Sequence, residues 1–279
     1  MLPLLHTSFL IQEEQTDGHH PMKFECSDGS IYYCKYLVGI KSTEIDCLAY
    51  EIIANRLLLA LNIPTPEIAL VQVNADSTSK KSLHFNKKAY PSAVCFGSKL
   101  VQPSSLVNAT QIFKERKEVK RYHNYKDLIR IAIFDLMFDN TDRGRKDNIN
   151  LLETVDVVNG KRKLQYVAID HAFIFGGVQG LRFFKPTDQL TTNGKLIENE
   201  YFISLVQHVP KKTRLQILEE FVTLYKEVYN NAVQEAFTMF HPTWQLYQNL
   251  NDKVYDYASN AERLNRVTVK MHESLKNLK

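Results

Sequence analysis

The stretch that decides the fold is Asp139-Asn140-Thr141-Asp142-Arg143-Gly144-Arg145-Lys146-Asp147-Asn148-Ile149-Asn150-Leu151-Leu152, and one hairpin later it is followed by Val167-Ala168-Ile169-Asp170-His171. An apolar helix runs into a polar loop that carries an aspartate and then asparagines, and a second aspartate closes an apolar strand. Phosphoryl transfer uses such a set. One carboxylate orients or deprotonates the attacking hydroxyl, while an asparagine and a second carboxylate hold the metal that neutralises the phosphates. These residues predict an ATP-dependent phosphotransferase of kinase-like fold.

The dipeptide Asn159-Gly160 predicts the hairpin that brings these groups together. Asn-Gly favours a type I′ turn with a two-residue loop, and in that register Asp170 lies opposite Ile149. A three-residue loop would instead place Asp170 opposite Asn150. Either register puts the second aspartate beside the asparagines, as a shared metal site requires. Whether Asn148 or Asn150 faces the metal stays open.

The polar loop has two other interpretations, a solvated turn and a calcium-binding loop. Asp, Asn and Gly populate turns for conformational reasons alone, so the loop could be a solvated turn that caps a buried helix. A calcium loop that starts at Asp142 would need oxygen ligands at its third and fifth positions, where Gly144 and Lys146 stand. The calcium interpretation therefore fails.

Composition and charge are those of an ordinary globular chain. The 279 residues can bury a core as one large domain or as two lobes, and 44% are hydrophobic and 24% charged. A net charge of +4 permits an anionic ligand but does not by itself indicate nucleic acid. The basic run 114–121 is interrupted by Glu115 and Glu118, which is typical of a solvated helix face. Nucleic acid is therefore not the expected partner.

Cysteine usage and the absence of targeting signals indicate a cytoplasmic protein. Four cysteines without CxxC spacing predict buried, reduced thiols rather than a disulfide frame or zinc site; they are Cys26, Cys34, Cys47 and Cys95. The apolar start, residues 1–11, lacks a basic region and a small-residue cleavage site, so it is not a signal peptide. No uncharged apolar run approaches the ~18 residues that a spanning helix needs, and no membrane partner is expected.

Strands and one helix are predicted first, and mainly helices afterwards, which defines an α+β class. The strands and helices expected are a hairpin in 20–40 with its turn at 27–30, a helix that starts at Thr43 and Asp46 and stops before Pro64, strands at 67–73 and 93–100, a helix capped by Asn124 with Asp127, and helices from Ile197 to the end. A composition shift near residue 100 predicts a β-rich nucleotide-binding lobe over 1–99 and a helical catalytic lobe over 100–279.

Three motifs together resemble the HipA-like kinases, a bacterial branch of the protein-kinase-like and phosphoinositide-kinase-like fold. They are Asn140-Thr141-Asp142-Arg143, Asn148-Ile149-Asn150-Leu151-Leu152 and Ile169-Asp170-His171-Ala172. Earlier segments are similar to the same family, and they are Tyr33-Cys34-Lys35-Tyr36, Tyr50 to Pro66 and Cys95-Phe96-Gly97-Ser98. The resemblance implies two lobes: a small antiparallel-sheet N-lobe with one helix, and a mainly helical C-lobe with a β-hairpin at the cleft. ATP would lie between them.

The resemblance also implies roles in binding ATP. Lys35 would contact the α- and β-phosphates, and Glu51 on the following helix would be the ion-pair partner that positions it. Glu44, at the start of that helix, is a weaker alternative partner.

In the catalytic loop, the resemblance assigns Asp142 to orienting or deprotonating the acceptor hydroxyl. Asn148 and Asp170 would bind Mg²⁺ that bridges the phosphates, with Asn150 as a second candidate ligand. Arg143 would hold the loop or a phosphate.

Some features depart from the family pattern. The metal-binding asparagine usually stands five residues after the catalytic aspartate, but here that position is Asp147, which could itself be a ligand. One residue inserted in 144–146 explains the shift. The glycine-rich phosphate loop is nearly absent, since Asp28-Gly29 is a single hairpin turn. Residues 176–196, which begin with Gly176-Gly177, fit an activation-like segment.

The resemblance implies an ATP- and Mg²⁺-dependent kinase that acts on Ser or Thr of a protein. A kinase for a small-molecule hydroxyl uses the same residues, and a pseudokinase that binds nucleotide or a partner without turnover would explain the inserted residue and the missing glycine loop. Transfer of labelled γ-phosphate distinguishes these classes. The family also suggests a small regulatory or antitoxin-like partner.

Overall fold

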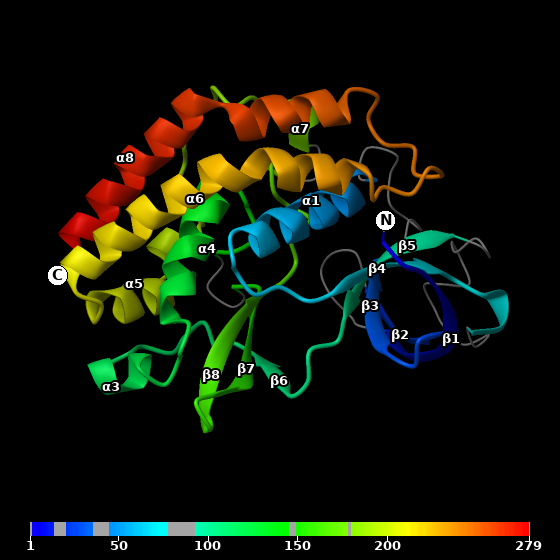
Figure 1. Ribbon diagram of the computed structural model, residues 1–279, viewed down its shortest axis with the longest axis horizontal. Coiled ribbons are helices and arrows are strands. Elements are labelled where there is room, and N and C mark those ends of the chain that lie inside the picture. The colour runs from blue at the N-terminus through cyan, green and yellow to red at the C-terminus, as the bar shows by residue number, and fades with distance from the viewer. Residues whose placement is uncertain are drawn as a thin grey trace.

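Five short strands close into a barrel at one end of the molecule (Figure 1). The computed structural model describes residues 2–13, 21–35, 45–77, 93–144, 149–177 and 180–278. The strands are β1 (Leu4–Glu13), β2 (Met22–Cys26), β3 (Ile31–Lys35), β4 (Ile68–Gln72) and β5 (Val94–Lys99), and their order is β1-β2-β3-β5-β4. The predicted hairpin and the strands at 67–73 and 93–100 are confirmed. Strand β1 was not predicted, and its parallel pairing with β4 closes the expected antiparallel sheet into a barrel.

Alternation along β3 places Lys35 outside the barrel core. Tyr32 and Cys34 point inward and are buried, whereas Ile31, Tyr33 and Lys35 are half-buried on the other face. The barrel has its own small hydrophobic core, which includes Cys26, Cys34 and Cys95. All four cysteines of the chain are buried and free, as predicted.

Helix α1 (Asp46–Ala60) follows β3 in the chain but packs into the larger core. It is buried on nearly every side, and its apolar residues belong to the same cluster as those of the C-terminal helices. Helix α6 (Lys211–Phe237) lies along it (Figure 1). Helix α1 ends before Pro64, as predicted, while Thr43 and Glu44 lie outside the described residues.

The second lobe is built around helix α4 (Tyr125–Met137) and a three-stranded sheet of order β6-β7-β8. The strands are β6 (Ser104–Leu106), β7 (Leu151–Val158) and β8 (Lys161–Ala168). Val158 pairs with Lys161, and Asn159 and Gly160 have positive φ of 50° and 72°, so the predicted two-residue loop is confirmed. The expected side-chain cap of α4 is wrong, because the Asn124 amide oxygen accepts the N–H of Tyr166 instead.

The remaining helices are α3 (Arg116–Val119), α5 (Glu200–Gln207), α7 (Leu250–Ser259) and α8 (Ala261–Asn277), with short 3₁₀ turns η1 (Ala75–Ser77), η2 (Gly180–Arg182) and η3 (Leu196–Glu198). Of these helices, α7 and α8 lie on the side of α4 away from the sheet, and α3 lies at the lower end near the β7-β8 hairpin (Figure 1). Residues 238–249 interrupt the predicted helical region. Within them, the indole N–H of Trp244 donates to the Val94 carbonyl at 2.9 Å and joins this segment to the barrel. No helix in the described part of the chain is long and apolar enough to cross a membrane.

Candidate functional site

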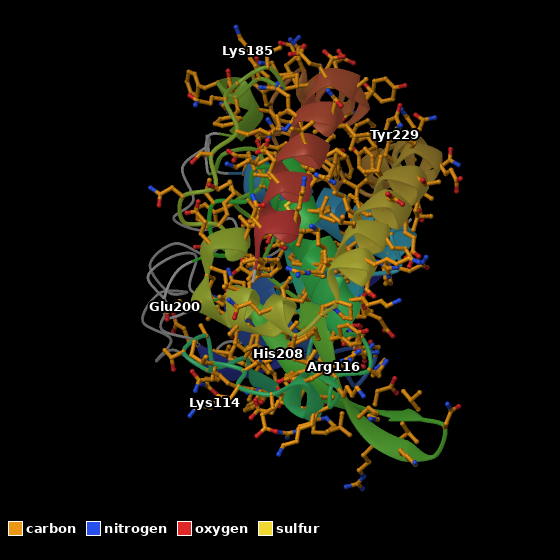
Figure 2. All side chains as sticks on the ribbon, turned by 90° about the vertical axis from the view of Figure 1, so that its left-hand side faces the viewer. Lys114, Arg116, Lys185, Glu200, His208 and Tyr229 are labelled. Atoms are coloured by element: carbon orange, nitrogen blue, oxygen red, sulfur yellow. The ribbon has the colours of Figure 1, made fainter. Side chains whose placement is uncertain are left out.

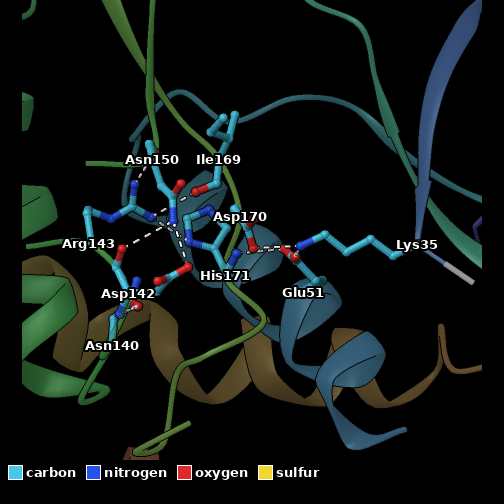
Figure 3. A network of polar contacts seen from close by, with 9 residues as sticks. All are labelled: Lys35, Glu51, Asn140, Asp142, Arg143, Asn150, Ile169, Asp170 and His171. Atoms are coloured by element: carbon cyan, nitrogen blue, oxygen red, sulfur yellow. Dashed lines mark hydrogen bonds and ion pairs between the residues drawn. The ribbon is translucent and has the colours of Figure 1, made fainter. Parts of the chain in front are cut away.

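Lys35 lies between two carboxylates that come from distant parts of the chain (Figure 3). Its Nζ forms an ion pair with Glu51 of α1, and lies 2.6 Å from Oδ1 of Asp170, which follows β8. Glu51 also accepts the backbone N–H of His171 at 2.9 Å. The barrel, α1 and the end of the hairpin therefore meet at one ammonium group.

The charges in this cluster shift the pKa values in different directions. Burial alone would lower the pKa of Lys35, but the charges of Asp170 and Glu51 raise it above its usual value. Burial raises the pKa of Glu51 despite the nearby ammonium. For Asp170, the attraction of Lys35 outweighs burial and lowers the pKa. One cation thus stands against two carboxylates, which leaves an excess of negative charge.

Asp142 is held at the edge of this cluster by an asparagine. The Asn150 amide N–H donates to Oδ2 of Asp142 at 3.1 Å and to its carbonyl at 3.3 Å. The N–H of Ile169 donates to the Asn150 carbonyl at 3.2 Å, which continues the hairpin ladder and places Asp170 beside Asn150. Of the two asparagines left open by the sequence, Asn150 is the one seen beside Asp142. Asn148 and Asp147 lie outside the described residues.

Arg143 is fully buried and holds the loop in place. All five of its N–H donors meet acceptors of the chain, namely the Asp135 carboxylate, the carbonyls of Ile149, Asn150 and Ile169, and Nδ1 of His171. Asp135 also accepts the amide N–H of Asn140 at 2.9 Å. Of the two roles that the resemblance leaves to Arg143, these contacts correspond to holding the loop. A side chain with 0% exposure is closed to a phosphate.

A second buried ion pair supports the start of the same loop. Lys195 Nζ lies 2.5 Å from Oδ1 of Asp139 and donates to the Asn140 carbonyl at 3.2 Å. Close packing adds to this support, since a Cβ on Gly144 would lie 2.0 Å from the carbonyl oxygen of Gly194. The segment after the hairpin thus fixes the backbone on both sides of Asp142.

A cavity of ≈ 370 Å³ opens between the barrel and the sheet β6-β7-β8. Four of the residues singled out from the sequence line it, namely Lys35, Glu51, Asn150 and Asp170. The rest of the lining is largely apolar and includes Tyr33, Pro66, Phe96, Val101, Leu152 and Ile169. A site with an apolar wall and a few converging charges suits a ligand with a flat base at one end and anionic groups at the other.

The donor set fits a hard divalent cation. Carboxylate and amide oxygens are the ligands that Mg²⁺ prefers, and Asp170 and Asn150 supply one of each where negative charge is in excess. Among the described residues, no group of three or more His, Cys, Asp or Glu side chains could hold a metal ion. Asn150 is not of these residue types, so this statement does not cover the pair of Asp170 and Asn150.

Several residues of the site were missed from the sequence. Tyr33 could have been found, because residues two apart on a strand share a face with Lys35. Asp135 is the one charged residue in the apolar stretch 131–138, a pattern that calls for a buried partner. Lys195 carried no local signal, since its partner Asp139 lies far away in the sequence.

Comparisons with known proteins agree with this geometry. A family model described as HipA-like kinase matches residues 10–179, more than half of the chain. No curated protein gives a significant match. The crystal structure of the proinflammatory kinase CtkA of Helicobacter pylori is similar over 99% of both chains, with 11% identity and a TM-score of 0.53. The Golgi casein kinase with Mn/ADP bound is similar over 99% of this chain and 73% of its own, with 12% identity and a TM-score of 0.51.

At such identities the structural similarity concerns the fold alone. It confirms a protein-kinase-like fold with a β-rich N-lobe that carries one helix and a helical C-lobe. The division of the chain at residue 99 and the roles of the individual side chains stay predictions.

Proposed function

The chain belongs to the HipA-like kinase family, and on that premise we propose that it is an ATP- and Mg²⁺-dependent kinase that phosphorylates a serine or threonine hydroxyl of a protein. The observation that carries the proposal is that four side chains converge on one cavity, namely Lys35, Glu51, Asn150 and Asp170. Asp142 is hydrogen-bonded to Asn150 beside them. The Golgi casein kinase, which shares the fold, was crystallised with Mn/ADP.

Each residue has a task that its position supports. The apolar wall takes the adenine, and Lys35, oriented by Glu51, binds phosphate oxygens. Asp170 and Asn150, with Asn148 as a further candidate, would hold Mg²⁺, which when bound neutralises phosphate charge. Arg143, which is fully buried, holds the loop in shape through its hydrogen bonds.

Asp142 acts on the acceptor. Its carboxylate accepts the proton of the attacking hydroxyl while the new O–P bond forms, and the bond from the γ-phosphorus to the β-phosphate oxygen breaks. ADP leaves with the displaced oxygen. A half-buried carboxylate oriented by the Asn150 amide suits this role, because its direction is set before the acceptor arrives.

The test is transfer of radiolabelled γ-phosphate to proteins of a cell extract, with ATP binding measured in parallel. Asp142→Asn should abolish transfer and keep nucleotide binding, whereas Asp170→Asn should weaken Mg²⁺-dependent binding as well. Asp256→Asn, on the exposed face of α7, is the matched control and should behave as wild type. Wild type that binds ATP without transfer would favour the pseudokinase, and labelling of small molecules only would favour the small-molecule kinase.

The antitoxin-like partner stays an expectation from the family resemblance. Copurification of a small protein with the tagged chain from its native cell would test it.

A further inference from the structure

Two basic segments that are separate in the sequence form one exposed ridge. The first is 114–121, which contains α3, and the second is the tip of the β7-β8 hairpin, 156–163. The N–H of Leu164 donates to the Arg121 carbonyl at 2.9 Å, and Lys163 Nζ donates to the Lys120 carbonyl at 3.2 Å. Figure 2 shows Arg116 on α3 and Lys114 just before it at the lower end of the molecule, and the hairpin projecting beside them. We call this surface the basic ridge.

The basic ridge carries more positive charge than the chain as a whole. Its two segments hold eight lysine and arginine residues and three acidic residues, while the net charge of the protein is +4. The exposed cations are Lys114, Arg116, Lys117, Lys120, Arg121, Lys161 and Arg162. The sequence alone suggested a solvated helix face, because the hairpin turn is 40 residues further along the chain and its contribution is visible only in three dimensions.

The three acids of the ridge are already engaged with other groups. Glu115 pairs with Lys117 at 2.8 Å, and Asp156 lies 3.2 Å from Nε2 of His123. The Glu118 carboxylate accepts the backbone N–H groups of Glu115 and Lys114, which lower its pKa. Within the described residues, the remaining exposed cations of the ridge have no ion-pair partner, so an external anion would find them available.

The ridge is rigid where it joins the hairpin. The rings of Tyr122 and Tyr166 stack with centroids 4.3 Å apart, and the Tyr166 hydroxyl lies 2.6 Å from that of Tyr201. Tyr122 also donates its hydroxyl hydrogen to Glu153 of β7. A preorganised surface loses less conformational entropy when a partner binds.

Exposed apolar side chains stand among the cations and favour a polypeptide over a nucleic acid. Val157 is 65% and Val155 43% exposed on β7. Val157 lies directly opposite Arg162 in the ladder, so the two share a face. A phosphate backbone is bound by cations and polar donors and gives nothing to bury two valines against, whereas an acidic segment with apolar residues satisfies both.

We propose that the basic ridge docks an acidic segment, interspersed with apolar residues, of the protein that accepts the phosphoryl group. This proposal rests on the proposed kinase function. Strand β8 runs from the ridge toward Asp170, and the six steps from Arg162 to Ala168 at about 3.3 Å each span about 20 Å. Since an extended chain covers at most about 3.6 Å per residue, about six or more residues must separate the acidic segment from the acceptor hydroxyl.

Binding of a labelled peptide tests the docking surface without any turnover. The probe is a fluorescein-labelled peptide in which glutamates alternate with leucines, measured by fluorescence anisotropy at low and at physiological salt. The variant Lys161→Glu with Arg162→Glu should bind about tenfold more weakly. The matched control, Lys270→Glu with Lys276→Glu on the exposed face of α8, has the same net charge and should bind as wild type.

The outcomes separate the alternatives. Weaker binding by the hairpin variant alone, and weaker binding of wild type at higher salt, support the docking surface. Equal binding by all three proteins overturns it, because the attraction is then not local. Tighter binding of a single-stranded RNA or a DNA duplex than of the peptide, lost in the same variant, overturns the assignment to a polypeptide.

A transfer assay ties the ridge to the acceptor. Serine peptides with and without the acidic segment, spaced by seven or more residues, are compared at a fixed ATP concentration. The segment should lower the KM for the peptide in wild type and not in the hairpin variant, with kcat unchanged. If no peptide is phosphorylated by wild type, the kinase function fails, while the anisotropy result still decides the docking surface. If the segment leaves KM unchanged, its link to the acceptor is overturned.

Discussion

Replacing Arg143 by methionine should lower the free energy of unfolding by about 3–5 kcal/mol, because it leaves a buried carboxylate without its cation. The side chains of Arg143 and Asp135 are 0% and 1% exposed, so water cannot take the place of the guanidinium. Methionine keeps most of the length and apolar stem of arginine. The cost therefore reports the lost charge and donors rather than a cavity.

A double substitution separates the orphaned charge from the lost donors. Asp135→Asn together with Arg143→Met leaves a neutral amide in the same volume, and its oxygen can still accept the Asn140 N–H. The double variant should be about 1–3 kcal/mol more stable than Arg143→Met alone, which is the usual size of coupling between contacting residues. The remaining deficit belongs to the backbone carbonyls that lose their donor.

The pH dependence of unfolding gives a second readout. Burial raises the pKa of Asp135, although Arg143 and Asn140 oppose the rise. Without Arg143, the pKa of the folded form moves further above the unfolded value of about 3.9. A carboxyl whose folded-state pKa is raised does not destabilise the fold below its unfolded pKa. Its cost in free energy of unfolding grows as pH rises through the folded pKa. The penalty of Arg143→Met should therefore shrink from neutral pH toward about pH 4, and the double variant should lack this trend.

Urea unfolding followed by circular dichroism measures the cost of Arg143→Met, the stability recovered in the double variant, and the pH dependence of both. Arg56→Met is the matched control, because Arg56 is 24% exposed and pairs with Glu235, which is 47% exposed. Its cost should stay within about 1 kcal/mol. The reasoning is refuted if Arg143→Met costs no more than this control, or if adding Asp135→Asn makes it less stable.

Three further substitutions test the site and its supports. Lys35→Met should reduce γ-phosphoryl transfer by about 10²-fold or more, since it removes the cation aimed at the phosphates; transfer close to wild type would exclude Lys35 from catalysis. Gly144→Ala should lower both transfer and the melting temperature, because its Cβ would collide with the Gly194 carbonyl, whereas Gly160→Ala meets no atom within 4 Å and should cost only about 1–2 kcal/mol of backbone strain. Similar losses in the two glycine variants would contradict this. Trp244→Phe should lower the unfolding free energy by about 1–2 kcal/mol in urea, because the indole loses its hydrogen bond to β5; no change would show that this bond is dispensable.

Local signals predicted the hairpin and its register correctly. The Asn159-Gly160 turn sets the pairing of two strands that adjoin it, so the information lies within a few residues. Asn150 and Asp170 then had to be neighbours. The ion pair of Lys35 with Glu51 is different. Spacing alone does not specify it, and only the family resemblance pointed to it.

Strand β1 was missed because its side-chain pattern is irregular. Register shifts occur between Thr7 and Phe9 and between Leu10 and Gln12, so the period-two alternation breaks twice within ten residues. The strand also leaves Leu4, Phe9 and Ile11 exposed, which hides its buried face. Closure of the barrel depends on pairing β1 with β4, a contact across more than 60 residues that no local pattern encodes.

The surroundings of α1 bear on whether the site turns over ATP. Asp46 at its start accepts the Tyr247 N–H at 2.8 Å and pairs with Arg182 at 3.1 Å, so the C-terminal lobe holds the helix that carries Glu51. The pair with Lys35 is therefore assembled in the protein alone. Stability alone does not explain this arrangement, because well-packed apolar residues at buried positions stabilise a fold as well as ion pairs do, or better. Charges placed against stability, in a cavity, concentrate at sites that bind and react. The geometry is thus the one that the proposed kinase function requires.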